Sequence, residues 1–172
     1  MITYILPGFS LANKNWAEDI KAQLEPKLPV SIYYWQHWAT GNPESDWITA
    51  ESGRIAQKIA SGEKSYSIIA KSIGTTVAGA VIKLLSQPPE KIIFCGLPIN
   101  DFLPKNDTYY DLLKSFPAQK ILCLQNESDP HGSSAMAEEF YGKLNPKIKI
   151  VPMPRSDHEY PYPEEFKKFL AS

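Results

Sequence analysis

Short apolar runs alternate with amphipathic segments along the whole chain, and this alternation limits the possible folds more than any other feature. Six runs have the length and the isoleucine and valine content of buried strands: 2–6, 30–35, 67–70, 91–95, 120–125 and 147–151. Helical spacing of apolar residues is found between or after them: 15–24, 48–60, 74–85, 133–144 and 163–170. Strands and helices in this alternation predict an α/β fold, with a doubly wound, mainly parallel six-stranded sheet and helices on both faces.

The length and composition predict one globular domain that covers residues 1–172. A chain of 172 residues can bury roughly 70% of the surface that it exposes when unfolded. With 18 basic and 19 acidic residues the net charge is −1, so we expect no electrostatic attraction to nucleic acid or to an anionic membrane. The apolar opening 1–7 has no basic lead and is too short for a signal peptide or a membrane span.

The two cysteines, Cys95 and Cys123, each fall inside a predicted strand. Two cysteines are too few for a disulfide framework, so we expect reduced, buried thiols in a cytoplasmic protein. The alternative is a bridge between adjacent strands. No cofactor is predicted, because no phosphate-binding glycine-rich loop or Walker lysine follows any strand. No metal site is predicted either, because the three histidines lack the spacing of metal ligands.

The pentapeptide Ala70-Lys71-Ser72-Ile73-Gly74 joins the third predicted strand to its helix. Small residues two positions before and after Ser72 permit a sharp turn, because a larger side chain at either position would strike the neighbouring backbone. Such a turn, the nucleophile elbow, raises the serine hydroxyl above the sheet at the start of a helix. Lys71 is expected to diverge from Ser72 and to place a solvated amine away from it.

The predicted order of the strands places this elbow at a ligand site. If the second strand lies outside the first strand and the third strand lies on its other side, the first and third strands are neighbours. Their helices then leave on opposite faces, and a crevice opens above the carboxyl ends of the two strands, where ligands of open α/β sheets bind. Its two sides would be Pro7-Gly8-Phe9 and Lys71-Ser72-Ile73.

A serine hydroxyl becomes a nucleophile when a base removes its proton and a third group orients that base. His158 follows the last predicted strand and precedes the last helix, so it can reach back over the carboxyl edge of the sheet. His37, which lies among aromatic residues, is expected to pack at the rim of the site or to line an acyl pocket. His131 is too close in sequence to Asp129 to be its obvious partner. His158 is therefore the candidate base.

Asp129 is the candidate third group, because it lies in the loop that follows the fifth predicted strand. The chain order Ser72, Asp129, His158 is the order of a triad on this architecture. Two other carboxylates are alternatives: Asp101 follows the fourth strand, and Glu127 is nearer to the end of the fifth. Asp129 is favoured because the proline after it stiffens the turn that would aim its carboxylate.

With these residues the chain resembles a compact, nearly lidless α/β-hydrolase, similar to the retinoblastoma-binding-protein-like small serine hydrolases. The resemblance covers essentially the whole chain, from Pro7-Gly8-Phe9 through the Ser72 elbow to Asp129 and His158. It implies an α/β-hydrolase core without the first two strands of the full fold. Many members carry glycine two positions before the serine, where this chain has alanine. Larger relatives carry a histidine where this chain has Pro7.

The resemblance also implies a chemistry. Ser72 would be the nucleophile, His158 the base and Asp129 the acid of a Ser-His-Asp triad. The backbone N–H groups of Phe9 and Ile73 would form the oxyanion hole. The implied activity is that of an esterase-like serine hydrolase that cleaves an ester, thioester or amide of a small acyl group through an acyl-enzyme.

The segment 97–116 lies where this architecture would carry a cap, and it has room for only a loop and one short helix around 107–113. We therefore expect a shallow, open site, with candidate substrate-binding walls at Leu97, Phe102, Trp35 and Trp38. The alternative function is that of a catalytically weak hydrolase-fold protein that acts as a module for binding a protein partner, because fold does not dictate function.

Overall fold

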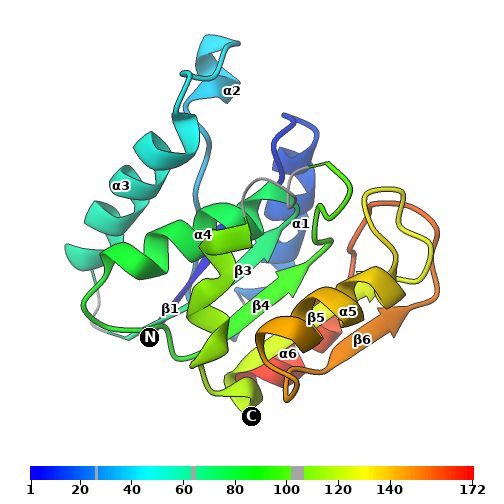
Figure 1. The fold of residues 1–172 in the computed structure, drawn as a ribbon. Helices are drawn as coiled ribbons and strands as arrows, with labels where there is room; N and C mark the ends of the chain where they lie inside the picture. Colours follow the sequence, from blue (N-terminus) through cyan, green and yellow to red (C-terminus); the bar gives the residue numbers. More distant parts are fainter. Residues whose placement is uncertain (26, 63–64, 102–106) are drawn as a thin grey trace.

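The computed structural model describes residues 1–25, 27–62, 65–101 and 107–172, and a parallel sheet lies at its centre (Figure 1). The sheet is six-stranded, with the order β2-β1-β3-β4-β5-β6 and parallel pairing throughout. Its strands are β1 (Ile2–Leu6), β2 (Val30–Ile32), β3 (Tyr66–Lys71), β4 (Ile92–Cys95), β5 (Ile121–Asn126) and β6 (Ile150–Met153). The predicted doubly wound sheet is therefore confirmed, including the positions of β2 and β3 on either side of β1.

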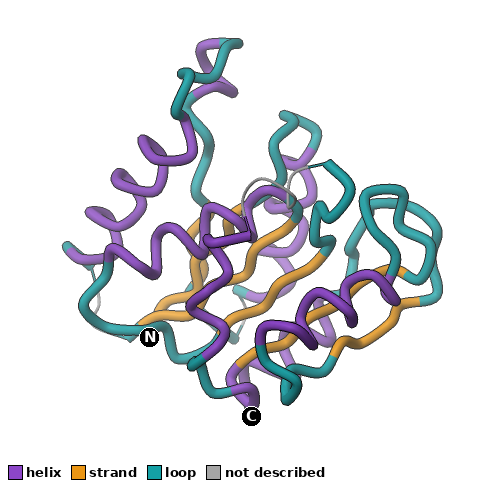
Figure 2. The backbone as a smooth tube through the Cα atoms, viewed as in Figure 1, coloured by secondary structure: helices purple, strands orange, loops and turns teal. Residues whose placement is uncertain are grey.

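Helices pack on both faces of the sheet (Figure 2). One face is covered by α3 (Trp47–Ala60), α4 (Ile73–Leu84), η2 (Asp107–Lys114, a 3-10 helix) and α5 (Ser134–Leu144). The other face is covered by α1 (Asn13–Leu24) and α6 (Pro163–Ala171). Two short helices, α2 (His37–Thr40) and η3 (Ala118–Lys120), complete the described elements. None of the described helices is both long and apolar enough to cross a membrane.

Some predicted boundaries were wrong, for local reasons. The second strand ends at Ile32 instead of residue 35, because the chain turns into α2, which the sequence analysis did not predict. The last strand begins at Ile150 rather than at residue 147 and includes Pro152. Proline argues against a strand, but β6 lies at the edge of the sheet, where a missing N–H donor is tolerated.

Glu51 shows how tertiary contacts override helical periodicity. A carboxylate on a helix ordinarily faces water, but the Glu51 side chain is only 2% exposed. The carboxylate accepts hydrogen bonds from the Tyr33 hydroxyl, at 2.6 Å, and from the Gln36 backbone N–H, at 2.8 Å. The segment after β2 therefore covers this side of α3 and supplies donors to the buried carboxylate.

Cys95 and Cys123 are free and buried, as predicted. They lie on neighbouring strands, but Cys95 pairs with Leu124, and Cys123 pairs with Phe94. Because side chains alternate along a strand, this register places the two thiols on opposite faces of the sheet. A bridge between the strands is excluded.

Candidate active site

Ser72 connects β3 to α4 in a backbone conformation that side chains rarely adopt. Its φ is 55° and its ψ is −129°, and it is the only non-glycine residue with positive φ in the described ranges. The turn is held by its own amide, which donates to the Cys95 carbonyl at 2.9 Å. The Ser72 carbonyl accepts from the Thr75 amide, at 2.9 Å, and from the Thr75 hydroxyl, at 2.7 Å. The sequence motif therefore forms a sharp strand-to-helix turn with a serine at its apex.

The loop after β1 lies directly against the first turn of α4. A Cβ atom added to Gly74 would lie 2.2 Å from the Leu6 carbonyl oxygen and 2.7 Å from that of Pro7. Glycine is required here because backbone fills the space that a side chain would need. This contact brings the loop that carries Phe9 next to the turn that carries Ile73. Neither amide donates a hydrogen bond to any described residue.

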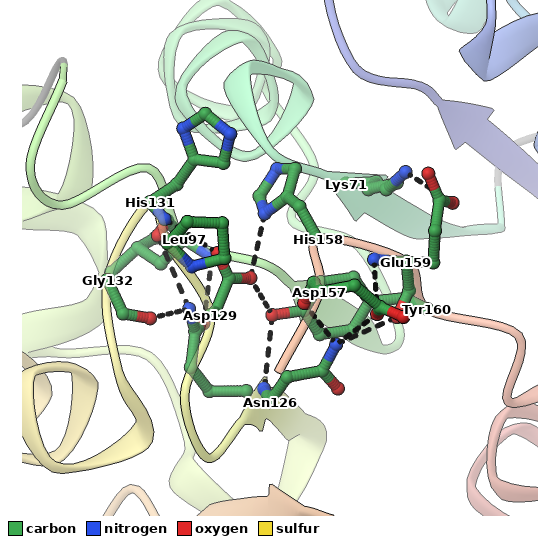
Figure 3. A network of polar contacts seen from close by, with 12 residues as sticks. Lys71, Leu97, Asn126, Asp129, His131, Gly132, Asp157, His158, Glu159 and Tyr160 are labelled. Carbon is green, nitrogen blue, oxygen red and sulfur yellow. Dashed lines mark hydrogen bonds and ion pairs between the residues drawn. The ribbon is translucent and has the colours of Figure 1, made fainter. Parts of the chain in front are cut away.

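Asp129 and His158 form the central pair of the site (Figure 3). His158 Nδ1 donates to Asp129 Oδ2 at 2.7 Å, and the Asp129 carboxylate is fully buried. Because a carboxylate only accepts, this bond assigns the proton to Nδ1 and leaves Nε2 with a lone pair when the imidazole is neutral. Nε2 is buried and has no hydrogen-bond partner among the described residues, so Ser72 and His158 are not hydrogen-bonded in this structure.

The two alternative carboxylates do not contact His158. Asp101 is paired with His131 on the surface. Glu127 is exposed, and its backbone amide bonds to the Met153 carbonyl. The His131 ring packs at a tilt against the His158 ring, with 4.3 Å between their centroids. Of the carboxylates considered from the sequence, the structure therefore brings Asp129 to His158.

Two residues that the sequence analysis missed support this pair. The Tyr160 hydroxyl donates to Asp129 Oδ2 at 2.5 Å. Burial, and to a lesser degree the bond to Asp129, raises the pKa of Tyr160 far above its usual value, so the phenol keeps its proton. Asn126 Nδ2 donates to the carbonyls of Asp157 and Glu159, both at 2.8 Å, and so holds the backbone on each side of His158. Asn126 could have been identified from the sequence as a polar residue at the end of a buried strand.

Lys71 is buried, and its predicted solvation is wrong. The side chain is 2% exposed, and Nζ donates to Asn13 Oδ1 at 2.8 Å and to Glu159 Oε2 at 3.1 Å. It also lies 5.5 Å from the centre of the Trp16 ring, within cation–π range. The ammonium stays buried because an amide, a carboxylate and an indole ring replace its water. Lys71 thus connects the end of β3 to the start of α1 and to the neighbour of His158.

The residues predicted as substrate-binding walls differ in their exposure. Trp35 and Leu97 are each 1% exposed and offer no surface to a substrate in this structure, so this prediction is corrected for both. Trp38 is partly exposed, and Phe102 lies outside the described residues. His37 is buried and stacks on Phe9, with 4.4 Å between the ring centroids.

The comparisons with known proteins identify the fold. No protein-family model matches the chain, and no curated protein is similar to it by sequence. Several solved structures share its architecture. An α/β hydrolase enzyme from the sediment metagenome of the Mar Chica lagoon in Morocco is 15% identical over 99% of this chain and 89% of its own, with a TM-score of 0.69. An α/β serine hydrolase without lid from Xanthomonas campestris is 14% identical over 91% and 72%, with a TM-score of 0.67.

An esterase from Pyrococcus furiosus is also similar, with 14% identity over 99% of this chain and 80% of its own and a TM-score of 0.64. At these identities the likeness concerns the backbone architecture and not the activity. The parallel sheet, the strand-to-helix turn at Ser72 and these neighbours together show that the chain has the α/β-hydrolase fold.

Proposed function

We propose that the protein is a serine hydrolase that cleaves an ester, thioester or amide of a small acyl group. The observation that carries this proposal is the His158–Asp129 pair, which leaves a buried, unpartnered Nε2 at the edge of the sheet where the Ser72 turn also ends. A neutral imidazole with Nδ1 held by a carboxylate is the form that serves as a general base.

In the proposed mechanism Ser72 Oγ attacks the carbonyl carbon while His158 Nε2 takes the hydroxyl proton, once the bound substrate has brought the two side chains together. The negative charge that forms on the substrate oxygen is stabilised by the Phe9 and Ile73 amides. The second amide lies at the positive end of α4. His158 then returns the proton to the leaving group, and the acyl group stays on Ser72. Water, activated by His158, releases the acyl group as an acid.

A small acyl group is proposed because the chain between β4 and β5 is short. It runs from Gly96 to Lys120, and its described helix η2 packs on α4, where Gly79 allows close approach. A Cβ at Gly79 would lie 2.2 Å from the Tyr109 carbonyl oxygen, so η2 is held against the body of the protein.

The narrower assignment to the retinoblastoma-binding-protein-like branch is also a proposal, and the sequence motifs support it. The free, buried thiols support a cytoplasmic location.

A fluorophosphonate probe tests the proposal, because it reacts with an activated serine and leaves a covalent adduct. We expect the wild-type protein to be labelled at neutral pH and the Ser72→Ala variant to stay unlabelled. His158→Ala should lower the labelling rate by several powers of ten, because it removes the imidazole that is proposed to take the proton. Mass spectrometry of the adduct should locate the probe on Ser72.

Ser61→Ala is the matched control, because Ser61 is an exposed serine at the end of α3. It should be labelled at the wild-type rate. A folded wild-type protein that stays unlabelled would refute the proposed activity and favour a protein-binding role for the same fold.

A further inference from the structure

Three aromatic side chains from the segment after β2 hold the loop that follows β1. Trp35 Nε1 donates to the Gly8 carbonyl at 2.9 Å. Trp38 Nε1 donates to the Phe9 carbonyl at 2.7 Å, and His37 Nε2 lies 2.9 Å from the same oxygen. Because a carbonyl only accepts, His37 carries its proton on Nε2. Two consecutive carbonyls of this loop therefore have ring N–H donors.

The bond from Trp35 determines the direction of one amide. The Gly8 carbonyl and the Phe9 N–H belong to a single planar peptide group, and in a trans peptide they point in opposite directions. Fixing the carbonyl oxygen on the Trp35 indole therefore fixes the direction of the Phe9 N–H. This is one of the two amides that the proposed function assigns to the oxyanion hole.

Trp35 is itself held firmly enough to serve as a reference point. Its side chain is 1% exposed and packs against the rings of Tyr33 and Trp47. Phe9, by contrast, lies in no helix or strand, and its side chain is 43% exposed. The Phe9 peptide group thus takes its orientation from a neighbouring segment of the core instead of from regular secondary structure.

We propose that Trp35 is a positioning residue for the oxyanion hole, with His37 and Trp38 restraining the next peptide group. This inference rests on the proposed hydrolase function. Donors that stabilise a developing charge are effective when they are oriented before the reaction, and a loop outside regular structure needs an external restraint for this. Because the oxyanion exists only in the transition state, loss of the restraint should lower kcat and leave KM nearly unchanged.

Trp35→Phe tests this inference, because it removes the N–H donor and keeps an aromatic ring. We expect kcat for a nitrophenyl ester and the rate of fluorophosphonate labelling to fall by about one power of ten, less than the two to three powers typical for loss of a whole donor. KM should stay within about twofold. Trp47→Phe is the matched control: Trp47 belongs to the same aromatic cluster, and its indole donates to no described residue. It should react at nearly the wild-type rate.

A second readout does not depend on activity. The NMR order parameter of the Phe9 amide should lie near 0.85, the value of rigid backbone, in the wild type and in Trp47→Phe, and should approach 0.6 in Trp35→Phe. If Trp35→Phe does not fold, Trp38→Phe replaces it, because Trp38 is partly exposed and its loss leaves the core intact. For this variant we expect a smaller fall in kcat, of about threefold, again at constant KM.

The outcomes separate the two proposals. A wild-type protein that does not react with the probe refutes the hydrolase function, and the role of Trp35 in catalysis with it. A reactive wild type whose Trp35→Phe variant reacts equally fast, or keeps a rigid Phe9 amide, overturns only the present inference. A parallel fall in the Trp35→Phe and Trp47→Phe variants would also overturn it, because the effect would then come from packing and not from the hydrogen bond.

Discussion

Single atoms decide how closely the two sides of the site can approach. The first turn of α4 meets the loop after β1 at Gly74, where the Leu6 and Pro7 carbonyl oxygens occupy the space of a side chain. At Gly96, which has φ of +65°, a Cβ would lie 2.5 Å from the Tyr160 ring and 3.0 Å from the His158 ring. Gly74 thus leaves room for the loop after β1 beside the Ser72 turn, and Gly96 leaves room for the rings of Tyr160 and His158.

Gly74→Ala should therefore separate the α4 turn from the loop. We expect the free energy of unfolding to fall by about 1–3 kcal/mol, as for other overpacked sites, and probe labelling of Ser72 to become slower. Gly53→Ala is the control, because a Cβ at Gly53, inside α3, would meet nothing within 4 Å. It should stabilise the protein by about 0.5–1 kcal/mol. Urea unfolding measures both changes, and equal stability of the two variants would contradict the steric argument.

At the scale of elements, Lys71 connects three segments of the site. It belongs to β3, its first partner Asn13 begins α1, and its second partner Glu159 lies in the segment between β6 and α6. Two of the three segments carry a residue of the proposed mechanism beside this contact, since Lys71 precedes Ser72 and Glu159 follows His158. The ion pair is therefore a tie between the nucleophile strand and the base segment.

Glu159→Gln should weaken this tie and leave the buried ammonium without a counter-charge. We expect a loss of about 1–3 kcal/mol in the free energy of unfolding, together with slower labelling of Ser72. The control is Glu139→Gln, in the exposed i,i+4 pair of Glu139 with Lys143, which should leave the unfolding midpoint unchanged. If both variants unfold at the same urea concentration as the wild type, the Lys71 pair contributes nothing to stability.

Apart from the short helices α2 and η3, the order and type of the elements could be predicted from the sequence, because strands and longer helices follow local periodicity. The predicted loop and turn positions of Ser72, Asp129 and His158 also came from local signals. The surroundings of these residues could not be predicted in the same way. Lys71 and Glu159 are 88 positions apart, and the sequence gives no sign that the two meet. The burial of Trp35 likewise depends on contacts between segments that periodicity does not relate.

At the scale of the whole molecule, each face of the sheet has its own core, and each core contains one thiol. Cys123 lies beneath α5 and η2, and Cys95 lies on the face of α1 and α6. Burial raises the pKa of Cys123 to about 12, and burial also raises the pKa of Cys95. Both thiols therefore stay protonated, and unreactive towards alkylating reagents, in the folded protein at moderately alkaline pH.

These raised pKa values predict a loss of stability in alkaline solution. An unfolded thiol releases its proton near pH 8.5, whereas the buried thiol keeps it, so rising pH stabilises the unfolded state relative to the folded state. Stability should be nearly unaffected by these groups below about pH 8 and should fall above it, with a slope that rises to about 1.4 kcal/mol per pH unit for each thiol about one pH unit above the unfolded pKa and lasts until the folded pKa is approached. Urea unfolding at pH 7.5 and 9.5 measures the slope.

The single variants Cys95→Ala and Cys123→Ala should each remove about half of the contribution that the thiols make to this slope, whatever they do to stability at pH 7.5. Tyrosines whose pKa values are also raised by burial, such as Tyr66 and Tyr110, add their own loss at higher pH, above about 10. A slope that is unchanged in both cysteine variants would mean that other groups control alkaline unfolding.

The backbone at Ser72 has a bearing on how such a chain evolves. A residue with a side chain in this conformation costs about 1–3 kcal/mol, whereas glycine would adopt the same angles without that penalty. If a protein with this fold served only to bind other molecules, a strained side chain at this position would bring no benefit. Glycine would then be the expected residue. The proposed function accounts for the serine that stands there instead, because a nucleophile needs the hydroxyl oxygen that glycine lacks.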